Sequence, residues 1–159
     1  MMGTKRAYTR ARAPWVETLT AVARDEAAHL AQVTRILMRR GGKLERLHKS
    51  AYANSLRLLV RKGGEGELID RLFVSALIEA RSSERFAVLA AAAQGDAELA
   101  AFYKALFSSE FGHYKVFLRL AYKVRSAAAV ESRWQQLLAA EARIIAEQLA
   151  GPGIHSGAG

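Results

Sequence analysis

The chain has 159 residues, half of them hydrophobic, which is enough for one domain with a sizeable core and excludes a largely disordered chain. It has no cysteine, which excludes disulfides, zinc–thiolate sites and iron–sulfur clusters, and no apolar run long enough to span a membrane. The net charge of +9 favours a polyanionic partner, which could be RNA, DNA or an anionic membrane surface, although an arginine-rich genome would explain it as well. Together with the lack of an apolar leader, the lack of cysteine leads us to expect a cytoplasmic protein.

Alanine and leucine dominate the sequence between its two prolines, Pro14 and Pro152. That composition is typical of helices, because these residues lose least on becoming helical. The first helix is predicted from Pro14 to Arg40, where apolar side chains recur every three or four residues. Gly41 and Gly42 are expected to end it.

Four further helices are predicted along the chain. Asp96 is expected to cap the helix that starts at Ala97. No segment alternates in the manner of a strand, so the predicted fold class is all-α. The four ranges are Leu44–Val60, Glu67–Ala93, Ala97–Arg125 and Val130–Leu149.

The domain organisation follows from these helices. One helical domain is predicted at residues 14–150. Residues 1–13 are basic and show no apolar periodicity, so we expect a flexible N-terminal segment there. The glycine-rich residues 151–159 are expected to form a flexible tail.

The pattern Glu-x-x-His occurs twice in the predicted helices, as Glu26–His29 and Glu110–His113. This spacing aims a carboxylate and an imidazole at the same side of a helix, one turn apart. Two such pairs, with a glutamate from each of two other helices, are how four-helix bundles hold two iron or manganese ions. A core histidine bonded to a nearby glutamate is the structural alternative for one pair, but two pairs on two helices favour metal.

The predicted helix Glu67–Ala93 offers two more carboxylates, Glu79 and Glu84. Five residues apart on a helix, they point about 140° away from each other, so only one easily faces a metal. Glu79 and Glu110 each lie about 14 residues from the turn at Gln94–Asp96, whereas Glu84 lies only about 10 residues before it. Level matching across two antiparallel helices therefore favours Glu79 as the ligand.

Glu84 is expected either to contact the ligands without binding the metal itself, or to form salt bridges with Arg81 and Arg85. A solvated ion-pair face is the plain alternative for this group. Glu141, on the last predicted helix, is the only other acidic candidate for the interior.

The segments DEAAHLAQV at 25–33, IEARSSERF at 78–86 and SEFGHY at 109–114 carry these residues. They resemble the MiaE-type tRNA hydroxylases, which are ferritin-like non-haem di-iron proteins. The second segment is the most specific, and the likeness covers residues 14–149. The resemblance implies a ferritin-like bundle, here of about five helices, with no catalytic residues beyond its metal ligands. Those ligands would be Glu26, His29, Glu79, Glu110 and His113.

The resemblance also implies an activity. Family members use two iron ions and O2 to hydroxylate the isopentenyl side chain of 2-methylthio-N6-isopentenyladenosine beside the tRNA anticodon. An electron-donor system would then be a partner, together with the tRNA anticodon stem-loop. An anticodon loop is single-stranded, so its modified base could be splayed into a protein pocket.

Basic residues gather after the first predicted helix and around the second. Such residues would position tRNA through its phosphates without reading its sequence. For those near helix C-termini, complementing the helix dipole is an alternative role. The candidates are Arg39, Arg40, Lys43, Arg46, Lys49, Arg57, Arg61 and Lys62.

A complete site of this kind needs one more carboxylate, from a helix that precedes Glu26–His29, and we expect this first helix of the ferritin-like bundle to be missing here. Residues 1–13 contain no acidic residue, and Glu17 lies about 13 Å from Glu26 along one helix, too far to share its metal. Three explanations stay open: a truncated chain or misplaced start, a degenerate homologue, or a second subunit that completes the bundle. A missing helix would also expose an apolar bundle face and favour self-association.

Two other functions remain as alternatives. One is a ferritin-like iron-oxidising or iron-storing protein, against which the basic charge and the IEARSSERF segment argue. The other is a truncated or degenerate homologue that binds tRNA or metal without full activity.

Overall fold

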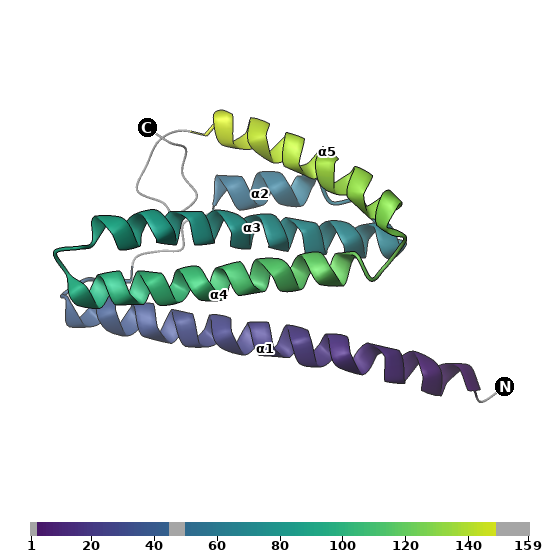
Figure 1. Cartoon of the computed structure of the whole chain (residues 1–159), viewed down its shortest axis with the longest axis horizontal. Coiled ribbons are helices and arrows are strands. Elements are labelled where there is room, and N and C mark those ends of the chain that lie inside the picture. The colour runs from purple at the N-terminus through teal and green to yellow at the C-terminus, as the bar shows by residue number, and fades with distance from the viewer. Residues whose placement is uncertain (1–2, 45–49, 149–159) are drawn as a thin grey trace. The chain divides into compact units, whose positions relative to one another are not determined.

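The computed structural model describes residues 3–44 and 50–148, and over these ranges the chain forms five α-helices and no strand. The chain divides into two compact units, Met1–Leu47 and His48–Gly159. The first unit contains α1 (Gly3–Arg39), and the second contains the other four helices (Figure 1). In the parts of the chain that the structure describes, no helix combines the length and apolarity that crossing a membrane requires.

Helix α1 begins at Gly3 rather than at Pro14, so the prediction of its start was wrong. Between Gly3, where the helix begins, and Pro14 the chain contains no further glycine or proline. Pro14 itself removes one backbone hydrogen bond and crowds the preceding turn, and the helix continues through it. The hydroxyl of Thr18 donates to the Pro14 carbonyl at 2.7 Å.

Two glycines end α1, as predicted. Gly41 adopts a positive φ of 76°, which favours glycine. The N–H of Gly42 donates to the Leu37 carbonyl at 2.9 Å, and that of Gly41 donates to the Met38 carbonyl at 3.1 Å. This pair of bonds is the Schellman arrangement, which satisfies carbonyls that the helix leaves open.

The second unit contains α2 (Ala51–Leu58), α3 (Gly64–Ala92), α4 (Ala97–Ala121) and α5 (Ala127–Ala146). Helices α3 and α4 run side by side, and α2 lies between α3 and α5 (Figure 1). The hydroxyl of Ser50 accepts from the Ala53 N–H at 3.2 Å and so starts α2. Leu44, where this helix was predicted to begin, is not helical, so that start was wrong; residues 45–49 lie outside the described ranges.

The turn between α3 and α4 makes these helices antiparallel neighbours, as predicted. The Asp96 carboxylate accepts from the Leu99 N–H at 3.1 Å, which confirms Asp96 as the N-cap of α4. Helix α4 ends at Ala121, before the predicted Arg125, and α5 begins at Ala127, before the predicted Val130.

Aromatic and aliphatic side chains of three helices form the core of the second unit. Phe73, Leu56 and Leu137 are fully buried, and the rings of Phe73 and Trp134 lie 4.9 Å apart between centroids. Burying such side chains stabilises the fold by about 1.5–3 kcal/mol each.

A fully buried carboxylate, Asp70 of α3, joins the ends of three segments. It accepts from Arg61 Nε and Nη2, at 2.9 and 2.8 Å, and from the Arg61 N–H at 2.9 Å. Arg133 of α5 donates to it at 2.8 and 2.9 Å and reaches the Leu59 carbonyl at 2.8 Å. Burial alone would raise the pKa of Asp70, but hydrogen bonds from Arg133 and Arg61 outweigh it and lower the pKa to about 2.

Candidate metal centre

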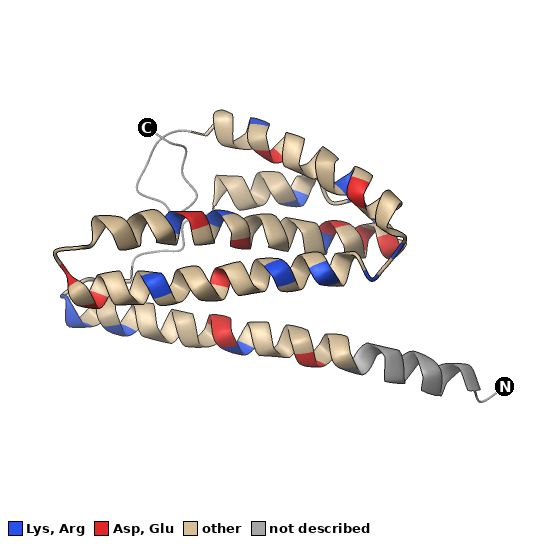
Figure 2. Cartoon of the chain, viewed as in Figure 1, with Lys and Arg blue, Asp and Glu red and all other residues tan. Residues whose placement is uncertain are grey.

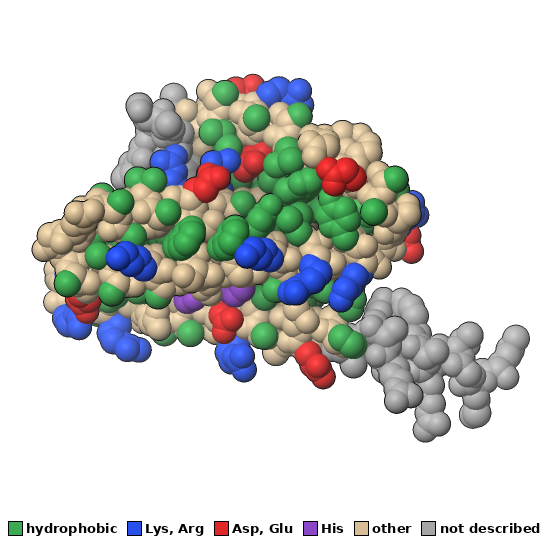
Figure 3. All heavy atoms as spheres, viewed as in Figure 1, with side chains coloured by type: hydrophobic (Ala, Val, Ile, Leu, Met, Phe, Trp, Pro, Cys, Tyr) green, Lys and Arg blue, Asp and Glu red, His purple; other side chains and the backbone are tan. Residues whose placement is uncertain are grey.

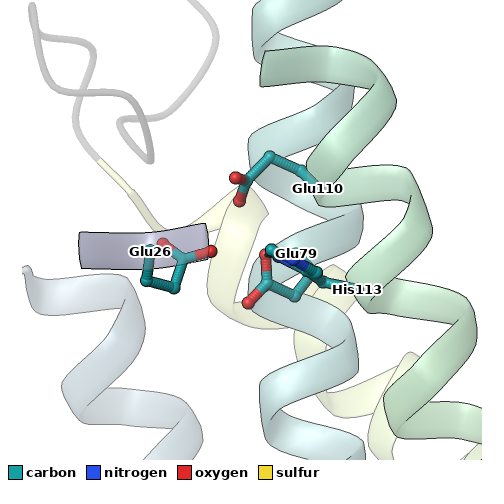
Figure 4. A group of neighbouring side chains, drawn as sticks. All are labelled: Glu26, Glu79, Glu110 and His113. Atoms are coloured by element: carbon teal, nitrogen blue, oxygen red, sulfur yellow. Dashed lines mark ion pairs between the residues drawn. The ribbon is translucent and has the colours of Figure 1, made fainter. Parts of the chain in front are cut away.

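Three chemically suitable side chains meet between α3 and α4. One ligand atom from each of Glu79, Glu110 and His113 lies within 4.8 Å of the others. His113 Nδ1 lies 3.9 Å from Glu79 Oε2. Figure 4 shows Glu79 on α3 and Glu110 and His113 on α4, with their side chains directed toward a shared space.

The antiparallel pairing of α3 and α4 explains this meeting. Glu110 and His113 are three residues apart and so lie on the same side of α4. Glu79 lies as far before the connecting turn as Glu110 lies after it, so the two reach the same level. The side chain of Glu79 is only 12% exposed, and Glu110 and His113 are buried. Buried carboxylates are costly unless partners or cations compensate their charge.

The other Glu-x-x-His pair, Glu26–His29, lies in α1, within the first unit. His29 Nδ1 lies 3.6 Å from Glu26 Oε1, so the two side chains share one side of the helix. The spacing therefore has the geometric effect in α1 that it has in α4. Figure 4 also labels Glu26.

Glu84 does not join the cluster in the second unit. Its side chain is 63% exposed and forms an ion pair with Arg81, as expected from the opposite directions of Glu79 and Glu84 on α3. Arg81 also approaches Glu141 Oε1, at 3.4 Å. Arg85 is half-buried.

Glu141, the other interior acidic candidate, is engaged by α2 and α3. The buried Tyr52 hydroxyl lies 2.5 Å from Glu141 Oε1, to which it donates, and 3.3 Å from the Leu77 carbonyl. Burial first, and then the bond to Glu141 and its charge, raise the pKa of Tyr52 far above its ordinary value. The phenol therefore stays protonated, and Glu141 is held by Tyr52 and Arg81.

The predicted tRNA contacts fall into three groups. Arg39, Arg40 and Lys43 are exposed at the end of α1 and beyond it, and Arg57 and Lys62 are exposed in the second unit. Arg61 holds Asp70, so a structural role accounts for its guanidinium. Arg46 and Lys49 lie outside the described residues.

Two carboxylates and an imidazole form a donor set that is compatible with iron. Zinc in structural sites commonly takes thiolates, which this chain lacks, whereas magnesium and calcium prefer oxygen ligands alone. The mixed oxygen and nitrogen donors therefore fit the metal of carboxylate-bridged helical bundles.

A family model described as tRNA-(MS2IO6A)-hydroxylase (MiaE) matches residues 2–156. The chain belongs to the MiaE family. The family resemblance of the three sequence segments is therefore confirmed.

Two relatives agree with this MiaE membership. A tRNA 2-(methylsulfanyl)-N(6)-isopentenyladenosine(37) hydroxylase of Pseudomonas putida is 39% identical over 130 residues, 82% of this chain and 62% of that protein. One of the same description from Salmonella typhimurium is 34% identical over 136 residues, 83% of this chain and 49% of that protein. The chain thus spans only about half to three-fifths of the length of these relatives.

A solved structure is also similar to this MiaE-family chain. It is described as Protein 43 with aldehyde deformylating oxygenase activity from Synechococcus, and is 30% identical with a TM-score of 0.84. The likeness covers 97% of this chain and 78% of that one. It confirms the predicted all-α, ferritin-like fold.

Proposed function

We propose that this chain is an O2-dependent di-iron monooxygenase that hydroxylates the isopentenyl side chain of 2-methylthio-N6-isopentenyladenosine in tRNA. The meeting of Glu79, Glu110 and His113 between two antiparallel helices carries the proposal. Membership of the MiaE family and the names of the two relatives supply the substrate class.

Five residues of this chain would hold the metal. Glu79, Glu110 and His113 form one set of donors, and Glu26 and His29, with the spacing of the α4 pair, supply the rest. Two bound iron ions would supply the activation of O2 and the attack on an unactivated C–H bond. The carboxylates would balance the charge of the metal, and the burial of Glu110 and His113 would limit the access of water to the reacting atoms.

The overall reaction sets the partners that the protein needs. One oxygen atom enters the C–H bond as a hydroxyl group, and the other leaves as water. This balance consumes two electrons and two protons, so a separate electron-donor system is part of the proposal. The substrate is a base in the anticodon loop of tRNA, and the net charge of +9 suits a polyanion of that kind. The expected place of action is the cytoplasm.

The network behind Glu79 has a positioning role in this proposal. Tyr52 contacts the Leu77 carbonyl and Glu141, and Arg81 contacts Glu141. These contacts involve Leu77 and Arg81 of α3, which lie two residues before and two residues after Glu79. They restrain the rotation of α3 about its axis, so Glu79 keeps facing α4.

Anaerobic loading with Fe(II) tests the proposal. We expect about two irons per chain and, with a reductant and O2, hydroxylated product from tRNA that carries the methylthio-isopentenyl base. Iron uptake and oxidation without tRNA turnover would instead support an iron-oxidising ferritin-like protein. Binding of tRNA without stoichiometric iron would point to a homologue that has lost the chemistry.

A further inference from the structure

Helix α4 carries a row of aromatic rings, Phe107, Phe111 and Tyr114, which we name the aromatic stripe. The rings of Phe107 and Phe111 are stacked, with centroids 6.1 Å apart and planes 6° from parallel. Phe111 and Tyr114 are stacked in turn, at 6.0 Å and 24°. Phe107 is 38% exposed, Phe111 is 40% exposed and Tyr114 is half-buried, so the first two rings of the row are open to solvent.

Cations flank the aromatic stripe along the same helix. Lys115 Nζ lies 4.0 Å above the centroid of the Phe111 ring. Lys104 and Arg119 are also exposed on α4, and Figure 2 shows several Lys and Arg positions along this helix. No carboxylate in the described ranges forms an ion pair with Lys104, Lys115 or Arg119. Figure 3 shows a face on which hydrophobic side chains lie directly beside Lys and Arg side chains.

This combination is unusual for a plain surface. Single exposed apolar residues are common and need no explanation. A contiguous row of stacked rings is different, because it leaves adjoining apolar surface of Phe107 and Phe111 in water, and such patches commonly mark interaction sites. The unpaired cations beside the row select the partner by charge, because they repel cations and attract anions.

We propose that the aromatic stripe is a stacking platform for unpaired bases of an RNA loop, with Lys104, Lys115 and Arg119 contacting its phosphates. Every nucleobase has a π face that stacks on an aromatic side chain, and the anionic backbone meets the neighbouring cations. Lys104 and Lys115 lie about 16 Å apart along the helix, the rise of about five stacked nucleotides. An acidic protein would use the cations but has no need for a row of parallel rings.

The proposal rests on the proposed function and adds the surface by which the RNA is held. Phe111 directly follows Glu110 on α4, so a base stacked on this ring lies level with the metal ligands along the helix. Consecutive residues point about 100° apart around a helix, so a neighbour of the target base would be held at the level of the centre but around the helix from it. The platform itself is sequence-tolerant, because stacking alone distinguishes bases poorly.

Binding of a fluorescently labelled RNA stem-loop with an unpaired, adenine-containing loop tests the platform, by anisotropy with iron-free protein. Phe111→Leu keeps an apolar side chain but removes the π face, and should weaken binding about fivefold to a hundredfold. Phe111→Tyr keeps the ring and should bind within about twofold of the unchanged protein. Lys115→Gln should reduce the slope of log K against log salt by about 0.7, the loss of one phosphate contact.

Arg143→Gln on α5, which also removes an exposed positive charge, is the matched control and should leave the slope nearly unchanged. Melting temperature and Fe(II) uptake of each variant show whether the fold and the centre are intact. Equal binding by Phe111→Leu and the unchanged protein would overturn the platform, as would an equal preference for fully paired RNA.

Two further outcomes separate this proposal from the proposed function. Hydroxylation of tRNA with an unchanged KM in Phe111→Leu would leave the proposed function standing and refute the platform. Platform-dependent RNA binding without any iron uptake or turnover would support the platform and refute the hydroxylase. A change of oligomeric mass on substituting Phe111, without a change in RNA affinity, would assign the stripe to contacts between copies of the chain instead.

Discussion

At the scale of single residues, Glu79 and Glu84 show how much a position on a helix decides. They are five residues apart on α3, yet Glu79 is largely buried near Glu110 and His113, whereas Glu84 is exposed and pairs with Arg81. Both are glutamates, so the chemistry of the side chain cannot account for the difference. The direction imposed by the helix does.

Glu79→Gln and Glu84→Gln are therefore a matched pair of variants. Glu79→Gln removes a proposed metal ligand without changing its size, and we expect iron affinity to fall at least about tenfold. Glu84→Gln should leave the affinity nearly unchanged because the metal does not need its charge. Anaerobic Fe(II) titration measures both, and an equal loss in the two variants would contradict the ligand assignment.

Asp70 is a residue whose charge stabilises the fold. Its pKa is about 2 when folded, against 3.8 for an ordinary aspartate, so its contribution is present above about pH 4 and lost as the pH falls toward 2. The shift corresponds to about 2 kcal/mol. Asp70→Asn also leaves Arg133 without its partner and should lower the free energy of unfolding by about 3 kcal/mol at pH 7.

Urea unfolding between pH 7 and pH 2 measures this contribution. The difference in the free energy of unfolding between the unchanged protein and Asp70→Asn should become smaller as the pH falls from about 4 to about 2. Glu65→Gln, which removes an exposed partner of Arg125, is the control and should change stability little. A constant difference across the whole pH range would show that the Asp70 charge is not responsible.

At the scale of the helices, caps and long-range hydrogen bonds keep the elements in register. The Asp96 side chain starts α4 directly after the turn from α3, so it helps to set the level at which Glu79 and Glu110 meet. Tyr52 joins α2 to α3 and to α5 through its single hydroxyl. Both residues act on the centre through backbone position.

Replacing the cap should destabilise the helix pair. Asp96→Ala leaves backbone N–H groups of α4 without an acceptor and should cost about 1 kcal/mol in the free energy of unfolding. Asp96→Ser retains a capping oxygen and should lose much less. Thermal unfolding followed by circular dichroism compares the two variants; equal losses would mean that the capping bond contributes nothing.

Removing the Tyr52 hydroxyl tests the positioning network. Tyr52→Phe leaves the buried Glu141 with Arg81 alone and should cost about 1–3 kcal/mol, with a weaker affinity for iron. Tyr122→Phe is the control, since the Tyr122 hydroxyl bonds the exposed Glu131 and its loss should matter little. If stability falls in Tyr52→Phe while iron affinity does not, the network supports the fold alone.

At the scale of the whole molecule, a shared metal would couple the two units. Glu26 and His29 belong to the unit of α1, and the other proposed ligands belong to the second unit. Metal binding should therefore slow hydrogen exchange in α1 as well as in α3 and α4. Mn(II) can replace Fe(II) in this measurement, which then needs no protection from oxygen.

Glu26→Gln is the variant that discriminates in this exchange experiment. It should abolish the metal-dependent protection of α1 while part of the protection of α3 and α4 remains. Unchanged protection of α1 in this variant would remove Glu26 from the ligand set.

The sequence predicted the elements well where the information was local. Apolar periodicity gave five helices, and Gly41 and Asp96 marked their ends because each forms a bond only a few residues away. That Glu79 and Glu110 lie at the same level was also predictable, since in two antiparallel helices it is sufficient to count residues from the turn that joins them.

Contacts between distant segments were not predictable. Tyr52 meets Glu141 across 89 positions, and Arg133 meets Asp70 across 63, distances at which periodicity carries no information. Arg61 looked like one more surface cation because its buried partner could not be known. The start of α1 was missed because Pro14 looked like a first helical residue rather than one inside a longer helix.

The level match across the α3–α4 turn also limits how this protein can evolve. An insertion or deletion of one residue inside either helix, between Glu79 and the turn or between the turn and Glu110, rotates the far ligand by about 100° and removes it from the centre. Length changes in this stretch should therefore be confined to the turn around Gln94–Asp96. The connection between α4 and α5 carries no proposed ligand, so a length change there does not alter the level at which Glu79 and Glu110 meet.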